Sequence, residues 1–447
     1  MSVKTQIDMT RGPIFSKLLE FSVPLIFSSI LQLFFNAADI IVVGRFAGDT
    51  SLAAVGSTSS LINLLVNLFM GLSVGTNVIA ANYFGQGNRE ELQNTVHTSM
   101  LLSLISGVIL TFTGVIFAKP ILYLMQSPQD VLNLSALYLR IYFGGITASM
   151  IYNFGSALLR AQGDTKRPLI ILLIAGIINV ILNLIFVIFL HLDVAGVAYA
   201  TVISQLFSAV MVVIILCRED NDFRLDFKKI TIVPHILAKI IKIGIPAGFQ
   251  GIMFSFSNVI IQSAINSFGQ VVISGNSAAI NLEGFVYTSM NGFSQGALTF
   301  TSQNLGAGKK DRIKKIVGIS HFSIIVIGLA LGWAGILFND QLLSFYTKTP
   351  EVIEVGKIRI WVIFSTYFMC GIMDAMANII RGCGHSLLPA IVTIFGASVL
   401  RIMWLATVFM IPQFHTPFVV FLSYPISWTI TWLIHLVCFI VIFKKIK

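Results

Sequence analysis

The sequence predicts an all-α membrane protein with twelve transmembrane helices arranged as two six-helix lobes. Three observations predict this class. Only 11% of the 447 residues are charged and 56% are hydrophobic, against about 25% charged residues in an ordinary soluble domain. Apolar segments long enough to cross a bilayer recur along the whole chain, and the second half repeats features of the first. A water-soluble enzyme or DNA-binding domain is excluded, because no soluble fold buries so much apolar surface.

Each predicted span is a run of roughly 20 mainly apolar residues between short polar breaks. No small-residue cleavage pattern follows the first span, so we interpret it as a retained helix and not as a signal peptide. In chain order the twelve predicted spans cover residues 18–43, 53–80, 94–118, 135–158, 168–190, 194–217, 238–265, 272–302, 316–338, 358–380, 389–411 and 417–443.

The distribution of the 29 Lys and Arg residues predicts the orientation. Most fall in loops on the side of the N-terminus, and Arg401 falls within a span. Six fall on the opposite side, namely Arg45, Lys119, Arg140, Lys348, Lys357 and Arg359. The positive-inside rule therefore predicts a multi-pass protein of the plasma (inner) membrane with both termini in the cytoplasm. The net charge of +10 is explained by this topology, and no nucleic-acid partner is expected.

The two halves of the sequence are copies of one six-helix unit. A shift of 222 residues superposes Pro24 on Pro246 and Asn36 on Asn258, and a shift of 221 superposes Arg160 on Arg381. Because six spans is an even number, the copies have the same orientation, and in transporters with such parallel repeats the substrate site lies between them. Duplicated channels and membrane enzymes also exist, but two lobes that can rock about a shared cleft favour a transporter.

The most charged segment of the chain separates the copies. We therefore predict an N-terminal lobe at residues 1–217, a cytoplasmic linker at 218–234 and a C-terminal lobe at 235–447. Since one chain contains both halves of a cleft, a monomer is expected.

Ionisable residues inside spans are costly and are candidates for function. Asp39 stands near the end of the first span, one turn after Asn36. Asn179 and Asn183 share one face of the fifth span, since residues four apart are neighbours on a helix. Thr201 lies at a matching depth in the sixth span. These oxygens predict a site for a coupling cation in the N-terminal lobe; the alternative is that the Asn and Thr side chains only join helices by hydrogen bonds.

The second lobe carries Glu283, Asp374 and Arg401 near the predicted midplane. We expect Arg401 to pair with one of the two acids, which leaves a net negative charge for an organic cation or a proton. Together with Asn36 and its repeat copy Asn258, these residues are predicted to form the substrate cavity or a second coupling site.

Several segments match enzyme motifs in their letters, but their surroundings in the sequence do not fit those motifs. GLSVG at residues 71–75 matches a nucleophile elbow but lies in an apolar span, where a helix-packing contact is the better interpretation. GAGKK at 306–310 lacks the other residues of a phosphate-binding loop. The seven His and four Cys residues show no metal spacing. We therefore expect neither an enzyme nor an ATP-driven pump, and no cofactor apart from a bound sodium ion.

A set of short motifs resembles the multidrug and toxic compound extrusion (MATE) family of secondary transporters. In order they are NAADIIVVG at 36–44, FGQGN at 84–88, LRAQGDTKRP at 159–168, NVILN at 179–183 with GVAYAT at 196–201, QNLGAGK at 303–309 and RGCG at 381–384. The resemblance implies two six-helix lobes around a central V-shaped cavity, and export driven by an inward proton or sodium gradient. It implies that Asp39, Asn179 and Thr201 belong to the cation pocket of the N-terminal lobe.

One position departs from the family pattern, which often has Asp where this chain has Asn183. A pocket with one carboxylate fewer binds sodium less strongly and favours proton coupling through Asp39. Sodium stays possible at Asp39, Asn179, Asn183 and Thr201, because amide and hydroxyl oxygens also coordinate it.

The sequence thus predicts an antiporter that exports amphipathic, cationic organic compounds in exchange for protons or sodium. The alternative is a flippase for lipid-linked saccharides or lipids, which the net negative charge of the second lobe disfavours. A membrane-embedded isoprenoid transferase would need paired acids for magnesium, and the sequence shows no D-x-x-x-D pattern.

Overall fold

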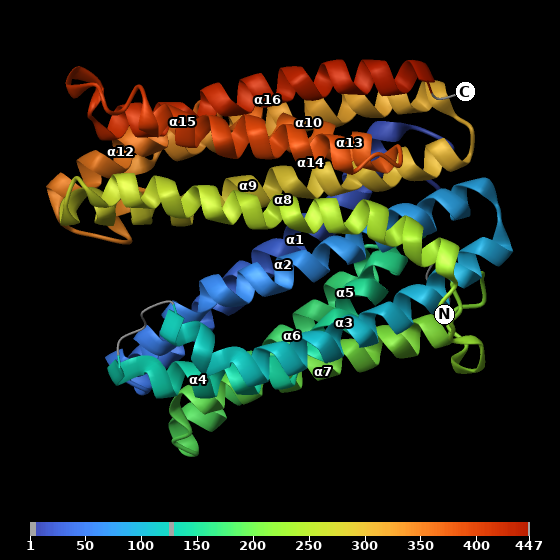
Figure 1. The fold of residues 1–447 in the computed structure, drawn as a ribbon, viewed down its shortest axis with the longest axis horizontal. Helices are drawn as coiled ribbons and strands as arrows, with labels where there is room; N and C mark the ends of the chain where they lie inside the picture. The colour runs from blue at the N-terminus through green and yellow to red at the C-terminus, as the bar shows by residue number, and fades with distance from the viewer. Residues whose placement is uncertain (1–5, 125–128, 446–447) are drawn as a thin grey trace. The chain divides into compact units, whose positions relative to one another are not determined.

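The computed structural model describes residues 6–124 and 129–445, and the chain is helical almost throughout (Figure 1). The first half comprises α1 (Ile14–Phe46), α2 (Asp49–Gln86), α3 (Arg89–Leu124), α4 (Gln129–Gly144), α5 (Ile146–Ala161), α6 (Lys166–Leu184), the π-helix η1 (Ile185–Phe189), α7 (Asp193–Cys217) and the short 3-10 helix η2 (Phe227–Lys229).

The second half comprises α8 (Pro234–Asn266), α9 (Gln270–Gly306), α10 (Lys310–Leu337), α11 (Asn339–Ser344), α12 (Pro350–Phe364), α13 (Tyr367–Gly382), α14 (Leu387–Thr393), the π-helix η3 (Ile394–Val399), α15 (Leu400–Ala406), the 3-10 helix η4 (Pro412–Phe414) and α16 (Pro417–Lys445).

The twelve predicted spans all fall on helical segments. Among the described residues, nine helices are long and apolar enough to cross a membrane. Two more spans are bent helix pairs: α4 and α5 meet at 46°, and α12 and α13 meet at 44°. The remaining span is α9, which has 37 residues but carries more polar side chains than the others. The prediction of twelve helices in two lobes is confirmed.

The internal repeat is also a repeat of backbone geometry. Three pairs of glycines, each 221 residues apart, have matching left-handed φ angles, which favour glycine because it lacks a Cβ atom. The pairs are Gly48 and Gly269 (83° and 86°), Gly87 and Gly308 (both 68°), and Gly163 and Gly384 (95° and 86°). The bends after α4 and α12 fall at equivalent positions as well. Both copies therefore end and bend their helices at the same points.

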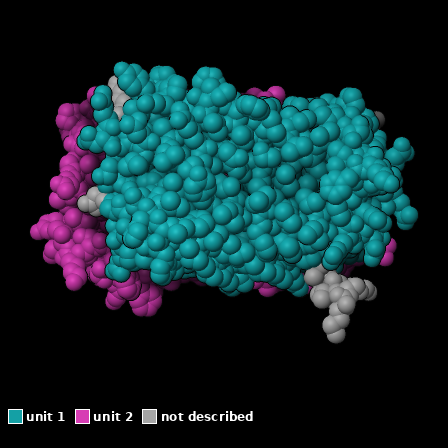
Figure 2. Space-filling model, turned by 90° about the horizontal axis from the view of Figure 1, so that it is seen from below, with its two compact units in different colours: residues 1–8, 27–248 teal, residues 9–26, 249–447 magenta. Residues whose placement is uncertain are grey.

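The chain divides into two compact units, coloured separately in Figure 2. Unit 1 comprises Met1–Asp8 and Phe27–Gly248, and unit 2 comprises Met9–Ile26 and Phe249–Lys447. Their limits differ from the lobe boundaries that we expected at residues 217 and 235. The divisions fall inside α1 and α8, two residues after Pro24 and Pro246, so each of these helices contributes to both units.

The segment predicted as a cytoplasmic linker, residues 218–234, is folded against unit 1. The Phe223 and Leu225 side chains are buried, and the backbone N–H of Asp226 donates to His97 Nε2 at 3.1 Å. The many charged residues of this segment predicted a solvated connector. Its apolar side chains are buried instead, because removing apolar surface from water is favourable.

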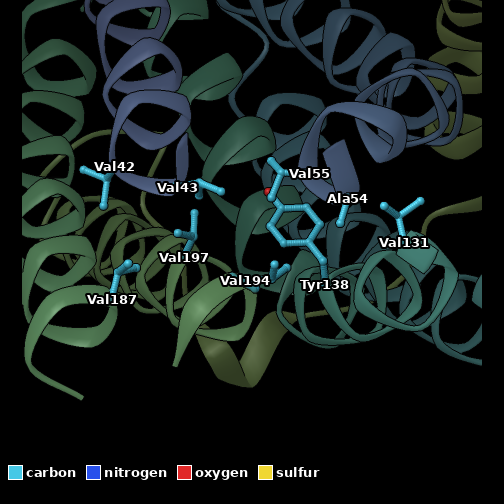
Figure 3. Close-up of a cluster of buried hydrophobic side chains, with 10 residues drawn as sticks. Val42, Val43, Ala54, Val55, Val131, Tyr138, Val187, Val194 and Val197 are labelled. Atoms are coloured by element: carbon cyan, nitrogen blue, oxygen red, sulfur yellow. The ribbon is translucent and has the colours of Figure 1, made fainter. Parts of the chain in front are cut away.

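A cluster of buried valines packs the C-terminal end of α1 against the rest of unit 1 (Figure 3). Val42 and Val43 of α1 lie in one cluster with Val55 of α2, Tyr138 of α4 and Val197 of α7. Their burial fixes the end of α1, and with it the acidic residue one turn earlier in the helix.

Candidate functional site

A chain of hydrogen bonds joins the four residues predicted as a coupling site in unit 1. Asn183 Nδ2 of α6 donates to Asp39 Oδ1 of α1 and to Asn179 Oδ1, the latter at 3.2 Å. Asn179 Nδ2 in turn lies 3.4 Å from Thr201 Oγ1 of α7. The structure therefore brings Asp39, Asn179, Asn183 and Thr201 together from α1 and from the consecutive helices α6 and α7, which lie far from α1 in the sequence.

A glycine allows α1 to approach α6 at this point. A Cβ atom at Gly176 would overlap the ring of Phe35. Phe35 lies one turn before Asp39 on α1, and Gly176 lies two turns before Asn183 on α6. The missing side chain at 176 therefore sets the distance across which Asn183 reaches Asp39.

The Asp39 carboxylate has no fixed counter-ion. The side chain is half-buried, and no Lys or Arg forms an ion pair with it within the described part of the chain. Asn183 is fully buried, and its Oδ1 atom has no hydrogen-bond partner among the described residues. Since the two ends of an amide are assigned and not observed, a rotated Asn183 could accept a hydrogen bond from a protonated Asp39. The cluster thus has free acceptor capacity for a proton or a cation.

A π-helical turn begins directly after this cluster. η1 starts two residues after Asn183, and π-helical turns are rare and concentrate at functional sites. In unit 2, η3 ends two residues before Arg401. Both predicted sites therefore border a local irregularity in the fifth span of their copy.

Asn36 and Asn258 do not join either cluster. Both side chains are exposed, and neither forms a side-chain hydrogen bond within residues 6–124 and 129–445. Although Asn36 and Asn258 are at equivalent positions of the repeat, neither forms a hydrogen bond with Asp39, Glu283 or Asp374 in the described structure.

The main charged contact of unit 2 was not predicted from the sequence. Arg359 of α12, counted among the basic residues on the external side, is only 2% exposed. Its Nε and Nη2 atoms donate to the two carboxylate oxygens of Glu283 at 2.5 and 2.8 Å, and its Nη1 donates to Asn276 Oδ1 at 2.8 Å. Arg359 therefore neutralises Glu283 inside the helical bundle.

The expected pairing of Arg401 with an acid is wrong in this structure. Arg401 Nε donates to Ser427 Oγ at 2.8 Å, and Asp374 accepts a hydrogen bond from Tyr287 at 2.8 Å. The net negative charge that we inferred for this lobe is wrong as well, because the buried Arg359 balances one of the two acids.

A helix-start signal could have revealed Arg359. The sequence Thr349-Pro350-Glu351 places Pro at the first turn of α12 with an acidic residue beside it, which is typical of a helix N-terminus. α12 therefore begins eight residues before the predicted span, and Arg359 lies about 13 Å along it at 1.5 Å per residue.

A cavity of about 780 Å³ in unit 1 lies apart from these residues. It follows α7 and the break between α4 and α5, and its lining is mostly apolar. None of the predicted site residues lines it.

Comparison with known proteins identifies the class. The MatE family model matches the chain twice, at residues 24–185 and 246–407. A probable multidrug resistance protein of Bacillus subtilis, YoeA, is 26% identical over 382 residues, which cover 84% of this chain and 82% of the relative. A FAD transporter of Shewanella oneidensis is 26% identical over 380 residues, 84% of each protein.

A solved structure described as the outward-facing conformation of a multidrug resistance MATE family transporter has the same fold. Its TM-score is 0.93 at 21% identity, and the match covers 100% of this chain and 99% of that one. The fold and the two matched repeats define a multi-pass membrane transporter. The chain belongs to the MatE family, and the resemblance drawn from its motifs is confirmed.

Proposed function

We propose that this transporter is a secondary active antiporter that exports organic compounds in exchange for protons, with Asp39 as the proton carrier. The observation that carries the proposal is the contact of Asn183 with Asp39, in a cluster that holds one carboxylate and no ion-paired cation. An acid in that setting can gain a proton in one conformation and release it in another. Coupling then requires that substrate affinity differs between the two conformations.

Sodium is the alternative coupling ion at the same four residues. Sodium binds best to several oxygen ligands with more than one negative charge. The four residues supply only one negative charge, because position 183 is Asn and not Asp. This single charge favours the proton.

We propose amphipathic organic compounds, cationic ones first, as substrates. The relatives named as multidrug resistance or export proteins support this class. The relative named as a FAD transporter carries an anionic compound, so FAD belongs in the same substrate panel. The proposed location is the plasma membrane with both termini in the cytoplasm, as the positive-inside rule predicts.

The flippase alternative remains a second candidate function because one specific observation now favours it. The sequence argument against an anionic lipid-linked substrate relied on a net negative second lobe, and the buried Arg359 removes that argument. Translocation of a fluorescent lipid-linked saccharide across vesicles, without any ion gradient, would support the flippase.

The deciding experiment uses the full-length protein in proteoliposomes. A fluorescent organic cation and FAD are offered under an imposed pH gradient, and then under a sodium gradient. We expect transport driven by the pH gradient, lost in Asp39→Asn because an amide cannot carry a proton. Asp193→Asn, the same change at an exposed carboxylate in the first turn of α7, is the matched control and should transport as the wild type does.

Three outcomes would contradict the proposal. Full transport in Asp39→Asn would exclude Asp39 as the carrier. Transport under the sodium gradient alone would make sodium the coupling ion. Transport that needs no gradient at all would favour the flippase.

A further inference from the structure

Arg401 is a buried cation without an anionic partner. Its side chain is 1% exposed, and no carboxylate lies within ion-pair distance of it in the described part of the chain. Nε donates to Ser427, but Nη2 has no hydrogen-bond partner among the residues that the structure describes. An arginine cannot lose its proton in a protein, and an unpaired charge inside a membrane-embedded bundle is costly.

The aromatic rings around Arg401 do not satisfy this donor. The guanidinium carbon lies 4.3 Å from the ring centre of Tyr424, 5.6 Å from Trp428 and 5.7 Å from Phe254. Such rings stabilise a cation through their faces. The N–H groups of a guanidinium lie in its plane, so they still need an acceptor at the edge of the cage.

A second unsatisfied donor lies in the same cage. Trp428 is 3% exposed, and its Nε1 atom also has no partner among the described residues. An indole N–H is usually hydrogen-bonded when it is buried. Arg401 Nη2, which is charged, and Trp428 Nε1 are therefore two neighbouring donors that both lack an acceptor.

The charges of unit 2 favour an anion over water as that acceptor. Glu283 is paired with Arg359, and Asp374 interacts with a third buried arginine, Arg381. Together with Arg401, the buried arginines carry one charge more than these two acids. A water molecule would fill the hydrogen bonds but would leave the charge of Arg401 uncompensated. The burial of both side chains favours a small ion over a substrate carboxylate.

We propose that Arg401 and Trp428 bind a small monovalent anion, such as chloride, inside unit 2. The site requires neither export activity nor ion coupling. It would make the stability of the protein depend on chloride independently of transport.

The test compares thermal unfolding of the purified full-length protein in sodium chloride and sodium gluconate at equal ionic strength. We expect the unfolding temperature to rise with chloride concentration and to level off, because a ligand that binds only the folded state stabilises it. Arg401→Gln should abolish the chloride effect. Trp428→Phe, which keeps the aromatic face and removes the N–H donor, should raise the half-saturating concentration about tenfold.

Trp432→Phe is the matched control. Trp432 lies one turn further along α16 and donates to His321 at 3.2 Å, so the chloride effect should persist in this variant. As a second readout, iodide should quench tryptophan fluorescence with a saturable component in the wild type and only by linear collision in Arg401→Gln.

Equal unfolding temperatures in chloride and gluconate would overturn the proposal. A full chloride effect in both Arg401→Gln and Trp428→Phe would do the same. If Arg401→Gln does not fold, the chloride dependence of the unfolding temperature is compared between Trp428→Phe and Trp432→Phe. An equal dependence in these two variants would overturn the proposal. None of these measurements depends on transport, so failure of the proposed antiport would leave them interpretable.

Discussion

Glu283 is the carboxylate partner of Arg359 and not of Arg401. The two guanidinium groups share the ring of Tyr424, at 5.2 and 4.3 Å from its centre, so the ion pair and the unpaired arginine belong to one cluster. The electrostatic character of unit 2 therefore depends on a residue that the sequence placed outside the membrane.

Removing one partner of this ion pair should destabilise the protein more than removing both. Glu283→Gln leaves Arg359 buried without its carboxylate, and loss of one partner of a buried pair costs about 3–5 kcal/mol. The double variant Glu283→Leu with Arg359→Met should recover most of that loss. Unfolding free energies in mixed detergent, arranged as a double-mutant cycle, measure the difference. Additive single effects would show that the pair is not coupled.

A larger side chain at Gly176 should separate α1 from α6 and weaken export. Gly176→Leu would overlap the ring of Phe35, and the displaced α1 would carry Asp39 away from Asn183. Transport should fall at least tenfold, and Phe35→Ala in the same chain should restore much of it by making room.

Gly56→Leu in α2 is the control for this prediction, because a Cβ atom there meets no described atom within 4 Å. It should transport normally. If Gly176→Leu also transports normally, the close approach of α1 and α6 is not required.

A second carboxylate at position 183 should introduce sodium dependence. Asn183→Asp would place two acids side by side, and two negative charges bind a sodium ion more strongly than one. We expect stabilisation by sodium over potassium, and transport under a sodium gradient, in this variant only. An Asn183→Asp protein that responds to sodium and potassium alike would contradict the proposed basis of ion choice.

The predicted topology can be tested by labelling single cysteines from one side of the membrane. Lys315→Cys, near the start of α10, should react only with reagent on the cytoplasmic side, whereas Lys348→Cys, just before α12, should react only from outside. The native cysteines are replaced first, and two of them, Cys370 and Cys383, are already buried. The opposite pattern would reverse the orientation.

Much of the proposed coupling site could be predicted from the sequence. Asn179 and Asn183 share a helix face by their spacing alone, and Asp39 is conspicuous because a charge in an apolar span is costly. The contact between Asp39 and Asn183 could not be predicted from the sequence. It depends on how closely α1 and α6 approach, which the packing of Phe35 against Gly176 shows. The position equivalent to Asp39 in the second copy is Ile261, so the repeat did not duplicate the carboxylate.

The second site was predicted less well for a physical reason. Hydropathy measures the average of a segment, and α12 begins with charged residues that lower this average although the helix continues. Arg359 was therefore counted among the external residues, and Arg401 was expected to pair with an acid that it does not contact.

The sequence by itself determined the class, the number of helices and the internal repeat. These follow from composition and periodicity, which act along the chain and do not depend on distant contacts. Only the tertiary structure decided which charges meet, because an ion pair such as Glu283 with Arg359 joins residues 76 positions apart. It also decided that the segment at 218–234 packs on unit 1, since burial of Phe223 requires a surface supplied by other helices.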